Sequence, residues 1–198
     1  MGLSVHYKGQ LKKSSSLKHL IDALADIAKT EMWNYFIFEE QFPNQSFSLV
    51  SNTENLYGIM ITPPECEPLC ISFLENRRMC GIINFNILRL DPSIGKELIY
   101  SVSTKTQHAG AEIHKKLILI LDYINTNYLV DFECYDEGQF WETRNTQLLD
   151  EIFERHTNLI SSFTDSFSIF PILDNEKIEN YCIRIAEITH KKDTKNGK

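Results

Sequence analysis

The sequence lacks any long apolar segment. Its longest uninterrupted aliphatic run extends from Leu117 to Leu121, whereas a membrane-spanning helix needs about 18 or more apolar residues. Residues 1–10 also lack the charged and then apolar pattern of a secretory signal. Gly2 does not begin a myristoylation motif, because His6 stands where Ser or Thr is required. We therefore expect a soluble protein without a membrane partner.

Cysteines are few and scattered: Cys66, Cys70, Cys80, Cys134 and Cys182. An odd number without regular spacing is typical of a reducing cytoplasm rather than of a disulfide framework. Cys66 and Cys70 lie four residues apart, without the tighter spacing and the second ligand pair of a zinc site. The cysteines therefore favour a cytoplasmic protein and predict no metal ion.

Motifs that mark large enzyme classes are also absent. The glycines form neither of the common phosphate-binding loops, and the signatures of serine hydrolases and zinc proteases do not occur. The sequence thus predicts no cofactor. An enzyme without such a motif stays open as an alternative, but a non-enzymatic role is favoured.

What the chain does contain is the composition of an ordinary globular protein: 198 residues, 42% of them hydrophobic and 24% charged. The net charge is −7, although residues 191–198 hold four Lys and only one Asp. We predict one domain over residues 1–190, followed by a basic, disordered tail at 191–198. The acidic body argues against a nucleic-acid partner and suits a basic protein partner.

Two segments have the pattern of a strand, an amphipathic helix and a second strand. In the first, the helix predicted at 17–30 has apolar residues three and four apart, which gives it one buried stripe. The two helices align when the sequence is offset by 96 residues, and whether this is a true duplication stays open. The predicted elements are 3–9, 17–30 and 33–38 in the first unit, and 97–104, 110–128 and 129–135 in the second.

Between these units, four short apolar segments are separated by turn residues, which predicts a four-strand antiparallel meander. After the second unit, amphipathic helices are expected at 146–163 and 174–189. The sequence therefore predicts an α+β fold with a mixed, largely antiparallel sheet. In it, two β-α-β units flank the meander, helices pack on the sheet, and two helices end the chain. The meander strands are predicted at 46–51, 56–62, 69–74 and 79–87.

Polar residues gather where the two strands of the second unit end. If these strands are parallel neighbours, their carboxyl ends meet at one edge of the sheet. The helix between them begins at the same edge, so its first turns lie there too. The candidate functional residues at this edge are Lys105, Gln107, His108, His114, Asp136, Glu137, Trp141 and Glu142.

Two functions fit this edge. The favoured one is an acidic interaction protein, for example an inhibitor or immunity-type partner of a basic protein, with Trp141 as an anchor. The alternative is a hydrolytic or metal-assisted enzyme that uses Lys105, His114, Asp136 and Glu137 for acid–base work. Acidic side chains at a strand end before a helix usually face water or stabilise the N-terminus of that helix. Whether the edge forms a pocket or a flat face stays open, as does the oligomeric state.

Overall fold

The computed structural model describes residues 2–43, 55–90 and 99–196. The chain divides into two compact units, residues 1–150 and 151–198, which we describe separately. Helices and antiparallel sheets both occur, so the predicted α+β class is confirmed. The single domain over residues 1–190 stays a prediction.

The first sheet has three strands among the described residues, with β1 (Ser4–Leu11) in the middle. β5 (Val102–Lys105) and β6 (Leu129–Asp136) flank β1, and each is antiparallel to it. β5 and β6 are therefore parallel to each other, as predicted for the second unit, but they are not neighbours. The helix that connects them, α4 (Gly110–Tyr128), begins and ends at the predicted residues.

One face of this sheet is buried. Directly opposed residues on neighbouring strands project to the same face, and Tyr7 is paired with both Val102 and Cys134. Val5 is likewise paired with Thr104 and Asp136. The Tyr7 hydroxyl lies 3.2 Å from Thr104 Oγ1 and accepts a hydrogen bond from the backbone N–H of Cys70. This face therefore joins the first sheet to the rest of the core.

A second sheet has the strand order β2-β3-β4 among the described residues, all antiparallel. Its strands are β2 (Asn34–Ile37), β3 (Tyr57–Thr62) and β4 (Leu69–Phe73). The helix α1 (Leu17–Thr30) connects β1 to β2, which lie in different sheets. The first predicted β-α-β unit is therefore wrong, although its helix is found at the predicted residues. Which strands share a sheet depends on pairing between segments far apart in the chain, and the sequence alone does not show this pairing.

The predicted strand at 79–87 is also wrong, because these residues begin the helix α2 (Ile82–Leu90). Ile83, Phe85 and Ile87 alternate as in a strand, whereas Phe85 and Leu88 have helical spacing. Phe85 and Leu88 are the buried ones, so packing selects the helix. The predicted strand at 46–51 lies outside the described residues. Of the predicted four-strand meander, the structure therefore contains β3 and β4.

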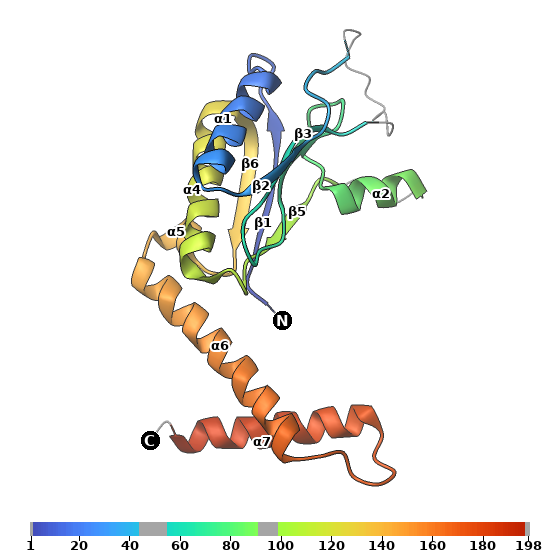
Figure 1. Ribbon diagram of the computed structural model, residues 1–198, viewed down its shortest axis with the longest axis vertical. Coiled ribbons are helices and arrows are strands. Elements are labelled where there is room, and N and C mark those ends of the chain that lie inside the picture. The colour runs from blue at the N-terminus through green and yellow to red at the C-terminus, as the bar shows by residue number, and fades with distance from the viewer. Residues whose placement is uncertain (1, 44–54, 91–98, 197–198) are drawn as a thin grey trace. The chain divides into compact units, whose positions relative to one another are not determined.

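The helices of the first unit lie on two sides of its strands. Figure 1 shows α1 and α4 beside each other along one side, whereas α2 lies on the other side. A cluster of buried residues packs around α2, with Phe38 and Ile82 partly buried against it. Its members are Leu56, Leu74, Cys80, Phe85, Leu88, Ile99 and Tyr100.

The chain ends in two long helices, as predicted, after the short helix α5 (Phe140–Thr143). Both α6 (Thr146–Ile169) and α7 (Ile178–Asn196) are longer than expected. Residues 191–196 belong to α7, so this part of the expected disordered tail is helical. Within the second unit, the hydroxyl of Tyr181 donates to the backbone carbonyl of Phe170 at 2.9 Å.

None of the helices in the described ranges has both the length and the apolar character needed to cross a membrane.

Candidate functional site

The edge predicted from the sequence exists, because β5 and β6 both end there and α4 begins there. Its residues differ in accessibility. His108 and Glu142 are exposed, and Gln107 is half-buried. His114 and Asp136 are buried in the interior. The edge therefore consists of a buried pair and a set of more accessible side chains.

The buried pair lies at the junction of α4 and β6. His114 is 0% exposed, and its Nε2 atom lies 2.9 Å from Oδ1 of Asp136. On the other side of the ring, Nδ1 lies 2.7 Å from the hydroxyl of Thr106, which is also buried. That hydroxyl lies 3.2 Å from the backbone carbonyl of Leu3. Its single proton goes either to this carbonyl or to the ring, so the histidine tautomer depends on that choice.

The Asp136 carboxylate organises the turn that follows β6. One oxygen accepts from the backbone N–H of Gly138 at 2.7 Å. The other accepts from the N–H groups of Phe140 and Trp141 at 2.8 and 2.9 Å. Burial raises the pKa of Asp136, but the contact with His114 and these N–H donors outweigh burial, so the pKa lies below its ordinary value.

This arrangement leaves the pair no path to a substrate. Both oxygens of Asp136 are occupied by protein groups, and the side chains of His114 and Asp136 have no solvent-accessible surface. A Cβ atom on Gly138 would lie 2.7 Å from Nε2 of His114, so the turn packs closely against the imidazole ring. The pair therefore holds the first turns of α4 against the turn that follows β6.

The remaining predicted residues have structural contacts as well. Trp141 is half-buried: its ring centroid lies 5.5 Å from that of Phe132, and the Arg144 guanidinium lies 5.0 Å above it. Glu137 accepts from the backbone N–H of Ser4 at 2.7 Å. Trp141 is therefore held in a local cluster and is less available as an anchor than the sequence suggested.

The opposite face of the first sheet is not among the sites predicted from the sequence. His6 is paired with Ser103 on one side and Tyr135 on the other. Lys8 is paired with Glu133 in the same way. We call the side chains of this face the outer face. They are Ser4, His6, Lys8 and Gln10 on β1, Ser103 and Lys105 on β5, and Glu133 and Tyr135 on β6.

The outer face is accessible to solvent. The exposed fraction of Tyr135 is 64%, large for an aromatic residue, and its ring centroid lies 6.0 Å from that of His6. Glu137, from the predicted edge, lies 4.0 Å from His6 Nε2, so the edge and the outer face are continuous. An accessible sheet face with aromatic and charged side chains is suited to binding.

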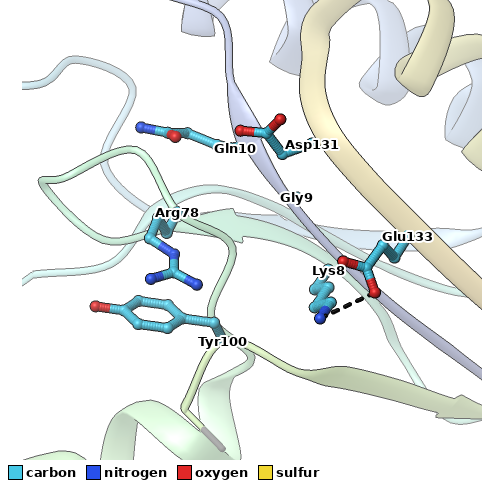
Figure 2. Close-up of a pocket in the computed structure, with 7 residues that line it drawn as sticks. All are labelled: Lys8, Gly9, Gln10, Arg78, Tyr100, Asp131 and Glu133. Carbon is cyan, nitrogen blue, oxygen red and sulfur yellow. Dashed lines mark ion pairs between the residues drawn. The ribbon is translucent and has the colours of Figure 1, made fainter. Parts of the chain in front are cut away.

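A pocket of about 310 Å³ lies at the other end of the outer face. Figure 2 shows Arg78 and Tyr100 along one side of it and Lys8 and Glu133 along the other. Its lining residues are Lys8, Gly9, Gln10, Arg78, Tyr100, Asp131 and Glu133.

Two contacts fix the sides of this pocket. The guanidinium carbon of Arg78 lies 3.6 Å from the ring centroid of Tyr100, a close cation–π contact. Lys8 Nζ lies 3.0 Å from a carboxylate oxygen of Glu133, drawn as the dashed line in Figure 2. The Tyr100 hydroxyl accepts from the side-chain amide of Asn76 at 3.1 Å, which holds the ring in place.

A β-bulge places the remaining acidic group. Lys8 pairs with Glu133, whereas Gln10 pairs with Val130, so β6 contains one more residue than β1 over this interval. The backbone of Asp131, in the bulge, is left-handed with a φ of 51°. Its carboxylate thereby lines the pocket together with Gln10, as Figure 2 shows. Sequence does not reveal strand register, so this site had no recognisable signal.

Within the described residues, no group of three or more His, Cys, Asp or Glu side chains is placed to hold a metal ion. Comparison with known protein families, with curated proteins and with solved structures gave no match.

Proposed function

We propose that this chain is a cytoplasmic, acidic interaction protein that binds a basic protein partner through its outer face. An inhibitor or immunity-type protein is the kind of molecule that fits. The observation that carries the proposal is the solvent-exposed Tyr135 beside the exposed carboxylate of Glu133. An exposed tyrosine next to acidic groups can anchor a partner and pair with its Lys or Arg side chains.

Burial of the His114–Asp136 pair favours this function over the enzymatic alternative. A general base must reach a proton on its substrate at hydrogen-bonding distance. His114 is fully buried between Thr106 and Asp136, which supports a structural role for it. The free cysteines are in keeping with a cytoplasmic location.

The ion pair between Lys8 and Glu133 on the outer face can open to admit a charged side chain of a partner. Both members of the Lys8–Glu133 pair are accessible to solvent, with 46% and 70% of their side-chain surface exposed. Exposed pairs contribute only about 0–1 kcal/mol to stability. A partner arginine can therefore replace Lys8 as the counter-ion of Glu133 at little cost to the fold.

The test is affinity capture of partners from a lysate of the source cells, with the full chain immobilised. We expect a basic protein to be retained in stoichiometric amount and to elute as the salt concentration rises. Tyr135→Ala and Glu133→Gln should each release it. Tyr123→Ala is the matched control, because Tyr123 is also exposed but lies on α4.

Two results would contradict the proposal. The first is the absence of any stoichiometric partner at low salt. The second is a partner that is retained by the Tyr135 and Glu133 variants but lost by the Tyr123 variant, because such a partner would bind elsewhere.

A further inference from the structure

Two side chains of opposite charge, Arg78 and Asp131, line this pocket. Neither forms an ion pair with another residue in the part of the chain that the structure describes. The Arg78 side chain is exposed and lies over Tyr100, and no ion pair involves it among the described residues. Asp131 is exposed and makes no ion pair there either. Guanidinium groups bind carboxylates through paired N–H donors, and carboxylates bind ammonium groups.

The charges that line the pocket balance. Lys8 and Glu133 neutralise each other at 3.0 Å, which leaves one cation, Arg78, and one anion, Asp131. A simple anion would meet the two carboxylates of the pocket, and a simple cation would meet Lys8 and Arg78. A neutral ligand with two separated charges satisfies both groups at once.

The size of the pocket limits the ligand. At about 310 Å³ it lies at the lower end of the range for small-molecule sites. Gln10 adds an acceptor: its side-chain nitrogen donates to the carbonyl of Asn76 at 3.2 Å, which leaves its Oε1 atom for a ligand N–H. The buried ring of Tyr100 adds an apolar wall.

We infer that this pocket binds a small zwitterion, of which a free α-amino acid is the chemical class. Its carboxylate pairs with the guanidinium of Arg78, and its ammonium group lies between Asp131 and Gln10. This is a small-molecule site and does not depend on the proposed protein partner, so either proposal can fail alone.

The experiment is an NMR titration of the isotope-labelled full chain with the standard free amino acids, first pooled and then singly. We expect saturable shifts of the backbone amides of Gly9 and Gln10. N-acetylated and C-amidated forms of the best ligand each lack one charge and should bind at least about tenfold more weakly. These two forms also distinguish a free amino acid from a peptide terminus, which carries only one of the charges.

Two variants test the assigned contacts. Arg78→Gln and Asp131→Asn should each weaken binding about tenfold or more. Asn tolerates the left-handed backbone of residue 131, so the bulge should persist. Arg89→Gln and Asp26→Asn are the matched controls, because both residues are exposed and lie outside the pocket.

The inference is overturned by any of three results. These are no titration with any amino acid up to about 10 mM, equal binding of the capped forms, and unchanged affinity in both pocket variants.

Discussion

The Nε2 atom of His114 lies 2.9 Å from Oδ1 of Asp136, with both side chains shielded from solvent. This contact joins the first turns of α4 to the end of β6, and the backbone N–H donors to Asp136 add the start of α5. Three elements thus meet at one buried charge. The stability of the first unit should therefore depend strongly on Asp136.

Asp136→Asn should lower the free energy of unfolding by about 3 kcal/mol. The neutral amide removes the negative charge beside Nε2 of His114, and it has one acceptor oxygen for three backbone N–H donors. Urea denaturation followed by circular dichroism measures this loss. Asp131→Asn, at an exposed site on the same strand, should change stability by less than about 1 kcal/mol.

The wild-type protein should lose stability as the pH falls below about 4, the ordinary pKa range of an aspartate. Because the pKa of Asp136 is lower in the folded protein, protons bind preferentially to the unfolded chain in this range. Its contribution is therefore complete above this range and disappears as the pH falls through the folded pKa. Urea unfolding at a series of pH values should show the gap between wild type and Asp136→Asn narrowing in acid. A constant gap would show that ionisation of Asp136 is not what stabilises the fold.

Gly138→Ala should destabilise the first unit by about 1–3 kcal/mol. The added Cβ atom would lie 2.7 Å from His114 Nε2 and 2.9 Å from Leu149 Cδ1, so the ring or the turn must move. Thermal unfolding measures the effect. Gly81→Ala is the control, since its nearest neighbour, a methyl group of Val102, is 3.3 Å away. Equal losses in the two variants would mean that the turn does not press on His114.

Tyr7→Phe should cost about 1–3 kcal/mol of stability. Its hydroxyl contacts Thr104 Oγ1, and it accepts from the backbone N–H of Cys70, which would lose its partner inside the core. Burial is the main cause that raises the pKa of this hydroxyl above its ordinary range. In an alkaline titration of tyrosine absorbance, Tyr7 should ionise only when the protein unfolds. Tyr123→Phe, at an exposed position, should be nearly neutral.

A single thiol should react rapidly with Ellman's reagent in the native protein at about pH 8. Cys182 is exposed, whereas burial raises the pKa values of Cys66, Cys80 and Cys134 to about 12 and also raises that of Cys70. Only the thiolate is nucleophilic, so these four should react slowly. All five should react in denaturant. A rapid phase that survives Cys182→Ser would contradict the assignment.

Local periodicity in the sequence was sufficient to predict the helices α1 and α4. The buried stripe of α1 and the apolar residues of α4 repeat at helical spacing, so both helices are found where the sequence predicts them. The α+β class and the two final helices follow from the same kind of pattern. Where strand and helix periods coincide, as around Phe85, the sequence was ambiguous, and packing against the core decided for a helix.

Tertiary structure alone decided where the polar groups lie. Sequence placed His114 and Asp136 at one edge, but only the packing of α5 and the turn at Gly138 buries them. Strand order sets β1 between β5 and β6 and thereby creates the outer face. The register between β1 and β6 shifts by one residue at the bulge, and this shift brings Asp131 into the pocket with Arg78. These features depend on pairings between residues far apart in the chain, which no local pattern encodes.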